Sequence, residues 1–303
     1  LQHRRGACPG SEGLDASTRP LTKTTMTAAL LLIIATLLPL ASFVVLVFLG
    51  KRMGKPLAGW IATTAIAGSF VCSMFALVVW VRTSAALPEE LTKLNDREIR
   101  YPFAANVDWL PFDVTGIVRH LEVGVYVDSL TIAMFAMVTF VATCVHVFSL
   151  GYMGDDKRYP RFFTYLGLFC FSMLGLVISS TILQLFVFWE LVGLCSYLLI
   201  GFWYEKKSAS NAAIKAFVVN RIGDFGFLIG LGILVYHLGN VSLPQVWQAL
   251  DVSKLTATGI TLADGTIIGA GLLTIMGIGL FCGAIGKSAQ FPLHVWLPDA
   301  MEG

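Results

Sequence analysis

Long apolar runs, separated by short polar segments, set the pattern of this chain. Seven of them are close to or above the ~20 residues that an α-helix needs to cross a bilayer. They occupy residues 27–50, 58–82, 128–151, 162–181, 183–204, 211–237 and 265–290. Runs of this length with so little charge are typical of transmembrane helices. The pattern therefore predicts an all-α, polytopic membrane protein with about seven transmembrane helices.

The polar segment between the second and third runs has a different periodicity. Apolar residues alternate with more polar ones from Leu121 to Val127, which is the period-two pattern of a half-buried strand. We expect a short β-strand or small hairpin on the external face. The chain then divides into an N-terminal tail, two helices with this external loop, and a helical region: 1–25, 26–127 and 128–303.

Lysine and arginine gather in alternate loops. The loops at 51–55, 155–161 and 205–207 are basic, whereas the connection at 238–264 carries only Lys254. Alternate loops lie on one side of a membrane, and the positive-inside rule makes the basic side cytoplasmic. This orientation predicts that the first helix has its N-terminus on the external side.

The first 25 residues do not fit that orientation, because they are polar and basic and would lie outside. Met26 immediately precedes the first apolar run. We expect that translation starts at Met26 and that residues 1–25 are a disordered tail or an upstream read-through. A cleaved signal is not expected, since the apolar run is too long and no small-residue cleavage site follows it.

Composition excludes several classes of protein. Only 13% of the residues are charged and the mean hydropathy is +0.76, against ~25% charged residues in soluble domains. The net charge is only +2, and lysine and arginine are scattered over several loops rather than clustered in one patch, so no nucleic-acid partner is expected. The six cysteines lack the spacing of metal or iron–sulfur ligands, and no glycine-rich phosphate loop follows a strand. We expect no metal and no cofactor in this chain itself.

Three of the apolar runs contain ionisable residues at depths where lipid surrounds a transmembrane helix. Glu190 and Asp224 lie near the middle of their runs, Arg221 lies close to Asp224, and Lys287 lies in the C-terminal part of its run. An ionised side chain at the centre of a bilayer costs at least ~2.5–3.5 kcal/mol. Such residues usually face the protein interior and mark proton or ion paths.

Lys287 is the strongest single candidate for a proton carrier. Pro292 should kink or break its helix, and transporters build ion sites at interrupted helices. A buried lysine can release its proton when a carboxylate partner moves away, so we expect Lys287 and Glu190 to form a titratable couple. Arg221 and Asp224 are three residues apart on one helix face and are expected to pair with each other.

Two further residues could support this site. Lys215 points roughly away from the face that carries Asp224. It either takes part in the proton site or extends its side chain towards the membrane–water interface. His294 follows Pro292, and it either relays protons from the cytoplasmic side or lies at the interface beside Trp296.

Three stretches also carry a family resemblance: FWELVGLCSYLLIGFW (188–203), KAFVVNRIGD (215–224) and GKSAQFPLHVWLPDAM (286–301). They resemble the glutamate helix, the next helix and the lysine helix of the largest antiporter-like membrane subunit of complex I, the NADH–quinone oxidoreductase. The similarity runs from about Met26 to the end of the chain and corresponds to the N-terminal part of that subunit.

By this resemblance, Glu190 sets the protonation of Lys287, and Arg221, Asp224 and Lys215 belong to the same channel. The resemblance implies two inverted bundles of five helices, each with one broken helix. It implies proton translocation in a bacterial inner membrane, driven by electron transfer from NADH to quinone in other subunits. The implied partners are the lipid bilayer and other complex I membrane subunits, including other antiporter-like ones. NADH, FMN, iron–sulfur clusters and quinone would be held by the partner subunits.

Members of that family continue beyond the point that corresponds to Gly303, so we expect this chain to be a fragment. The first alternative function is a subunit of a multisubunit cation/proton antiporter, a membrane-bound hydrogenase or an inorganic-carbon uptake complex, which share the same helices. The second alternative is a structural membrane scaffold, in which the buried charges only hold helices together.

Overall fold

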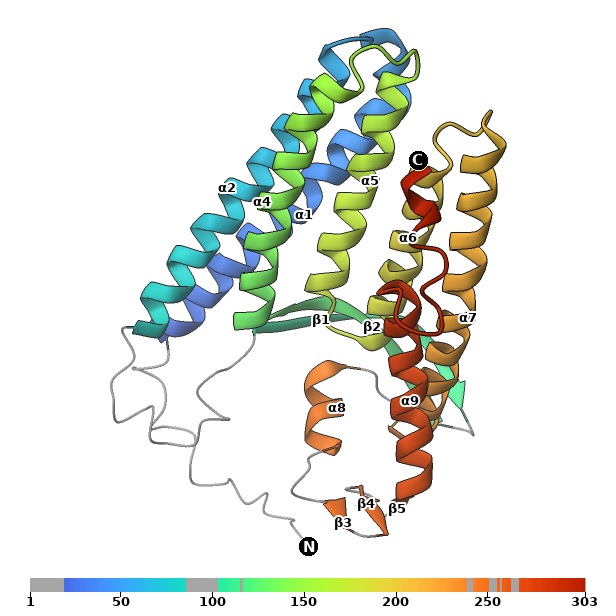
Figure 1. Cartoon of the computed structure of the whole chain (residues 1–303). Helices are drawn as coiled ribbons and strands as arrows, with labels where there is room; N and C mark the ends of the chain where they lie inside the picture. The colour runs from blue at the N-terminus through green and yellow to red at the C-terminus, as the bar shows by residue number, and fades with distance from the viewer. Residues whose placement is uncertain are drawn as a thin grey trace, which may run out of the picture.

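The computed structural model describes residues 19–85, 103–114, 117–238, 242–250, 255–256, 258–262 and 267–302. Its helices are α1 (Arg19–Met53), α2 (Leu57–Ala85), α4 (Ser129–Tyr152), α5 (Tyr159–Ile178), α6 (Ile182–Ile200), α7 (Lys207–Leu238), α8 (Leu243–Ala249) and α9 (Ala270–Lys287), followed by the 3-10 helix η2 (Asp299–Glu302) (Figure 1). Most of the predicted tail, residues 1–18, lies outside the described part, and α1 begins at Arg19.

All of the described helices except α8 and η2 are long and apolar enough to cross a membrane, which makes seven candidate spans in the described part of the chain. This confirms the predicted all-α membrane fold. Two of the predicted spans are cut back by four or five residues at one end. α6 ends at Ile200 rather than at residue 204, because Gly201, a poor helix former, takes the capping position. α9 begins at Ala270 because the three residues before it form strand β5 (Ile267–Gly269).

The spanning helices form two groups (Figure 1). In the first group α1 packs on α2 and α5, and α2 packs on α4. Leu32, Phe135 and Leu174, from α1, α4 and α5, are fully buried between these helices. In the second group α7 packs on α6 and α9, around a core that includes Phe227 and Met276. Contacts between α5 and α6 join the two groups.

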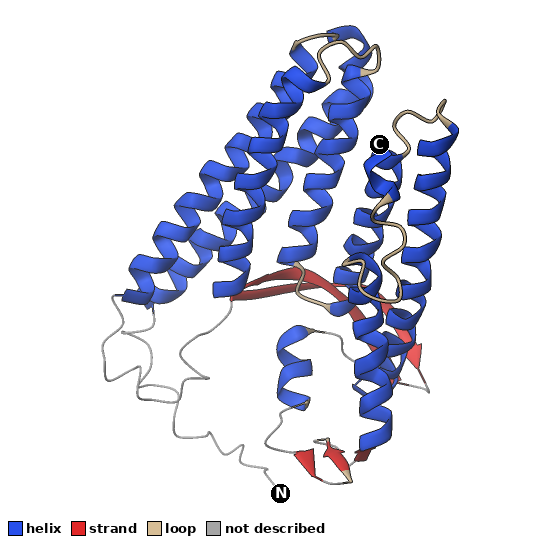
Figure 2. Ribbon diagram, in the orientation of Figure 1, coloured by secondary structure: helices blue, strands red, loops and turns tan. Residues whose placement is uncertain are grey.

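A β-hairpin crosses the bundle at the end where α5 meets α6 (Figure 2). Strands β1 (Phe103–Val114) and β2 (Ile117–Val127) pair antiparallel, which confirms the predicted strand and adds a longer partner. The backbone N–H of Gly124 donates to Oε1 of Gln184 on α6 at 2.9 Å, so the hairpin is tied to the second group. A smaller antiparallel sheet consists of β3 (Leu255–Thr256), β4 (Gly259–Thr261) and β5.

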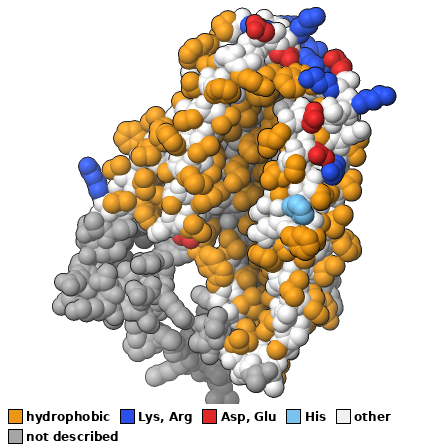
Figure 3. All heavy atoms as spheres, in the orientation of Figure 1, with side chains coloured by type: hydrophobic (Ala, Val, Ile, Leu, Met, Phe, Trp, Pro, Cys, Tyr) orange, Lys and Arg blue, Asp and Glu red, His pale blue; other side chains and the backbone are white. Residues whose placement is uncertain are grey.

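The three basic loops lie together at the opposite end of the bundle, where charged side chains gather (Figure 3). The Lys55 ammonium donates to the carbonyl oxygen of Gly154 at 2.6 Å. Arg158 forms an ion pair with Glu205 at 3.3 Å. These two contacts connect all three loops, so they lie on one side, as the alternation of charge along the chain predicts.

Candidate functional site

The middles of α6 and α7 carry opposite charges that face each other. Glu190, near the midpoint of α6, forms an ion pair with Arg221 on α7. The Arg221 guanidinium also lies over the ring of Phe217, 4.6 Å from its centroid. Arginine keeps its proton in proteins, so this pair compensates the Glu190 carboxylate within an apolar layer.

A second ion pair lies one turn further along α7. Oδ2 of Asp224 is 3.6 Å from Nζ of Lys287, and Asp224 is only 2% exposed. The other carboxylate oxygen, Oδ1, accepts a hydrogen bond from the indole N–H of Trp189 at 2.9 Å. Trp189 directly precedes Glu190, so one turn of α6 contacts both charged residues of α7.

These pairs differ from those predicted from the sequence. Lys287 pairs with Asp224 rather than with Glu190, and Glu190 pairs with Arg221. The reason is geometric: α9 packs closely against α7, and the long Arg221 side chain reaches across to α6. Arg221 nevertheless stays near enough to Asp224 and Lys287 to act electrostatically on both.

Lys287 also approaches α6. Its ammonium group lies against Gly193, where even a methyl group would collide with it. Gly193 is one helical turn from Glu190. The lysine therefore lies between α6 and α7, in contact with Asp224 on one side and within a turn of Glu190 on the other.

Glycines set the distance between α7 and α9. Gly223 and Gly286 are the sequence neighbours of Asp224 and Lys287. A methyl group at Gly223 would lie 2.8 Å from the carbonyl oxygen of Cys282 and 3.0 Å from the Cα atom of Gly286. Small residues of this kind let membrane helices approach closely, and here they bring the second ion pair together.

α9 ends at Lys287, at the depth where α6 and α7 are at their midpoints. The N–H of Gln290 donates to the carbonyl oxygen of Ile285 at 3.0 Å, and the N–H of Ala289 to that of Gly286 at 3.3 Å. This is the Schellman pattern of a helix C-terminus, with Ala289 in the left-handed region at φ 49°. The lysine charge thus lies at the negative end of a helix dipole, which favours it.

The predicted break in this helix is present, but it lies before Pro292. The chain leaves the helix at Ser288, where the Schellman pattern ends it. The indole N–H of Trp296 then donates to the Gly286 carbonyl oxygen at 3.0 Å, which gives this carbonyl a second donor besides the Ala289 N–H.

Three buried oxygens at the ion pairs accept no hydrogen bond from the described residues. They are Oε2 of Glu190 and Oδ2 of Asp224, which face Arg221 and Lys287, and Oδ1 of Asn220. Asn220 lies one turn before Asp224 on the same face of α7. Buried polar atoms usually have partners, supplied by protein or by ordered water. The Asn220 and Asp224 oxygens on this face of α7 can therefore accept hydrogen bonds from water.

The remaining predicted site residues lie away from the two pairs. Lys215 forms an ion pair with Asp299 of η2 at 2.7 Å, and both side chains are more than 40% exposed. His294 is exposed and its ring stacks on Phe291. The structure thus brings together four of the predicted residues, and a supporting or relay role for Lys215 and His294 stays a prediction.

Trp189, Gly193 and Asn220 were not predicted as site residues. Each is within one turn of Glu190 or Asp224, so helical spacing alone makes them candidates. What the sequence does not show is that the Trp189 indole points towards α7.

Comparison with known proteins identifies two matching family models. Residues 179–303 match the model described as NADH:quinone oxidoreductase/Mrp antiporter, TM. Residues 114–163 match the model described as NADH-ubiquinone oxidoreductase (complex I), chain 5 N-terminus. Together the two ranges cover more than half of the chain.

Similar proteins are named as subunits of quinone oxidoreductases. The chain is 43% identical over 267 residues to NADH-quinone oxidoreductase subunit L of Rickettsia bellii, an alignment that covers 88% of this chain and 38% of that protein. It is 40% identical over 276 residues to subunit L of Neisseria meningitidis, covering 90% of this chain and 38% of that protein. It is 50% identical over 184 residues to NAD(P)H-quinone oxidoreductase chain 5 of a Synechocystis species, covering 61% and 26%.

The fold is also similar to a solved structure, that of the Mrp complex from a Dietzia species. The TM-score is 0.62 at 24% identity, over 93% of this chain and 25% of that chain. The similarity supports the antiporter-like arrangement of the helices. The chain therefore belongs to the family of antiporter-like membrane subunits that includes subunit L, or chain 5, of NADH–quinone oxidoreductase.

Proposed function

We propose that this chain translocates protons, as part of a membrane subunit of NADH–quinone oxidoreductase (complex I). One observation carries the proposal: two ion pairs, linked by Trp189, lie at the midpoints of α6 and α7, at the depth where α9 ends. The chain spans 38% of the length of the subunit L proteins that it matches. The activity is therefore proposed for the whole subunit, with this chain supplying one proton site.

Proton transfer would follow from an exchange of partners on α7. Arg221 and Asp224 share a helix face, so Arg221 can turn to Asp224 when Glu190 gains a proton. That turn weakens the attraction between Asp224 and Lys287, and the proton on Nζ of Lys287 leaves. The proton on Glu190 then passes through water to the neutral lysine, which restores both pairs. One proton enters at Glu190 and one leaves from Lys287 in each cycle.

The membrane setting follows from the charged loops. The basic end of the bundle would face the cytoplasm of a bacterial inner membrane, with the N-terminus of α1 outside. Other complex I membrane subunits, including antiporter-like ones, and the lipid bilayer would surround the chain. NADH, FMN, iron–sulfur clusters and quinone would be bound by partner subunits, whose electron transfer drives the partner exchange.

Cation/proton antiport is the second candidate function. The family model matched by residues 179–303 is described by the Mrp antiporter as well as by the quinone oxidoreductase. The two functions share the proton site and differ in what drives it. An antiporter needs a cation gradient, whereas a complex I subunit needs NADH and quinone.

Proton pumping by the assembled full-length complex in proteoliposomes tests the proposal. Lys287→Ala and Glu190→Gln are expected to lower NADH-driven pumping at least tenfold, because each removes an ionisable group of the proton path. Lys206→Ala is the control, since Lys206 lies over the Trp203 ring at the basic end and away from the pairs. Quinone reduction is measured in the same preparation.

Two outcomes would contradict the proposal. If the variants fail to assemble but the surviving complexes pump normally, the charges are structural. If pumping requires a sodium gradient rather than NADH and quinone, the antiporter function replaces the proposed one.

A further inference from the structure

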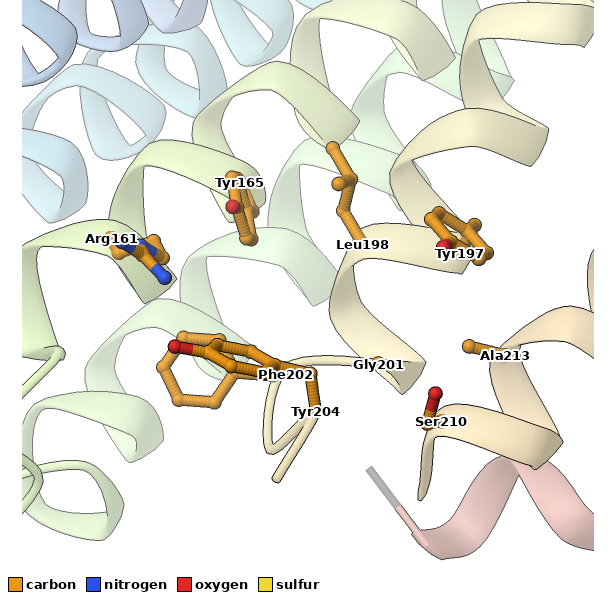
Figure 4. A pocket seen from close by; sticks show the side chains of 9 residues that line it. All are labelled: Arg161, Tyr165, Tyr197, Leu198, Gly201, Phe202, Tyr204, Ser210 and Ala213. Carbon is orange, nitrogen blue, oxygen red and sulfur yellow. The ribbon is translucent and has the colours of Figure 1, made fainter. Parts of the chain in front are cut away.

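A cleft opens at the basic end of the bundle, where α5, α6 and α7 meet (Figure 4). Its volume is about 190 Å³. Tyr197, on its wall, lies about two turns beyond Glu190 on α6, roughly 10 Å along the helix. The cleft is therefore separate from the two ion pairs.

The cleft presents one cation and several hydroxyl groups that have no partner among the described residues. The guanidinium of Arg161 forms no ion pair or hydrogen bond among the described residues, whereas its neighbour Arg158 pairs with Glu205. The hydroxyl groups that line the cleft likewise have no partner in the described part of the chain; they belong to Tyr165, Tyr197, Tyr204 and Ser210. All of these groups are available to an anionic ligand.

These side chains converge from separate elements. In Figure 4, Arg161 and Tyr204 lie towards one side of the cleft and Ser210 and Ala213 towards the other, with Tyr165 between α5 and α6. The described residues that line the cleft include no acidic side chain. Two carboxylates of the basic loops are engaged elsewhere, Glu205 with Arg158 and Asp156 with the indole of Trp203.

The chemistry of the lining suits a phosphate group. A guanidinium matches the geometry of phosphate oxygens, and hydroxyl groups donate to the oxygens that remain. The cleft is smaller than the 300–1,000 Å³ that is usual for sites holding drug-sized ligands, which argues against a quinone or a nucleotide. It is large enough for a phosphate whose remaining atoms extend outwards.

The position of the cleft points to lipid as the source of that phosphate. It lies at the first turns of α5 and α7 and the last turns of α6, at the level of the basic loops, where tyrosine is typical of a membrane interface. Leu194 and Ile214, one turn deeper on the same faces of α6 and α7, have exposed apolar side chains. Basic residues at this level attract anionic lipids.

We infer that the cleft between α5, α6 and α7 binds the phosphate headgroup of an anionic phospholipid, held by Arg161 and the surrounding hydroxyl groups, with the acyl chains along α6 and α7. This site is independent of the proton path, and its failure would leave the proposed function untouched.

Retention of phosphatidylglycerol tests the inference. The assembled full-length complex is placed in phosphatidylcholine nanodiscs doped with phosphatidylglycerol, delipidated in detergent and examined by native mass spectrometry. Arg161→Gln is expected to lower phosphatidylglycerol retention about tenfold, as for the loss of one charge-assisted contact to a phosphate. Lys157→Gln is the matched control, since Lys157 is an exposed cation of the same loop that does not line the cleft.

The inference would be overturned if Arg161→Gln and Lys157→Gln retained phosphatidylglycerol equally. It would also be overturned if the wild type retained phosphatidylcholine as well as it retains phosphatidylglycerol. Displacement of phosphatidylglycerol by millimolar inorganic phosphate would assign the cleft to a soluble anion instead. If Arg161→Gln does not assemble, Tyr204→Phe combined with Ser210→Ala keeps the charge, removes two donors and must also lower retention.

Discussion

The two carboxylate oxygens of Asp224 have different surroundings. Oδ1 accepts the indole N–H of Trp189, whereas Oδ2 faces Lys287 and accepts no hydrogen bond within the described residues. The Trp189 ring stacks on Phe227, 6.0 Å between centroids, so its orientation is fixed. Trp189 thereby positions the carboxylate so that one oxygen stays directed at the lysine.

Removing this indole donor should weaken proton transfer without unfolding the helices. Trp189→Phe keeps an aromatic ring against Phe227 but loses a hydrogen bond to a charged group, a contribution of about 1.5–3 kcal/mol. We expect NADH-driven pumping to fall roughly tenfold and its pH profile to shift, measured in proteoliposomes of the assembled complex.

Trp203→Phe is the matched control. Its indole donates to Oδ2 of Asp156 at the same 2.9 Å distance, but in a loop outside the site. If both substitutions reduce pumping equally with unchanged pH profiles, Trp189 has only a packing role.

At the scale of the element, the end of α9 is the least usual feature. Ala289 takes φ 49° at the position after the helix cap, where glycine is the common residue and other L-residues are strained by about 1–2 kcal/mol. The strain persists because the hydrogen bonds of the Schellman pattern and the Trp296 indole close the helix at this point. The position of the helix end in turn fixes the depth of Lys287 within the bundle.

Ala289→Gly should therefore stabilise the protein by about 1 kcal/mol, because glycine adopts this conformation without a steric penalty. Denaturant-induced unfolding of the detergent-solubilised protein measures the change. Ser288→Gly, one residue earlier at φ −86°, should give no stabilisation. Equal effects of the two substitutions would contradict the account of the helix end.

Across the whole molecule, the acid–base behaviour of the loops can be separated from that of the membrane site. Burial alone would raise the pKa of Asp156. Hydrogen bonds from the Trp203 indole and the Arg158 backbone N–H, together with the charges of Arg158 and Lys55, instead hold it below its ordinary value of 3.8. The stabilisation from Asp156 is therefore complete above that ordinary value and is lost as the pH falls through the lower folded pKa.

Below about pH 4, the basic loops should consequently lose part of their order. On acidification, the protection of the loop that carries Asp156 against hydrogen exchange, relative to an unfolded chain at the same pH, should fall more in the wild type than in Asp156→Asn. The variant has lost the charge at every pH. Asp155→Asn, an exposed neighbour, should behave like the wild type. Acid sensitivity that persists in Asp156→Asn would assign the effect to another group.

The sequence predicts the membrane fold well, because apolar length and loop charge act over whole segments. It singles out Glu190, Asp224 and Lys287 as candidate site residues for the same reason, since a charge in such a segment is conspicuous, and the structure brings them together. It does not predict which charges pair. Pairing across helices depends on the close contact of Gly223 with Gly286 and on where α9 ends, and both are properties of tertiary packing.

The most direct test of the central claim is a double-mutant cycle on proton pumping. Asp224→Asn and Lys287→Met are measured singly and together in the assembled complex, alongside the corresponding cycle for Glu190→Gln with Lys287→Met. Residues in one ion pair couple by about 0.5–3 kcal/mol, whereas independent residues are nearly additive. We expect Lys287 to couple more strongly with Asp224 than with Glu190. A larger coupling with Glu190 would contradict the pairing of Lys287 with Asp224.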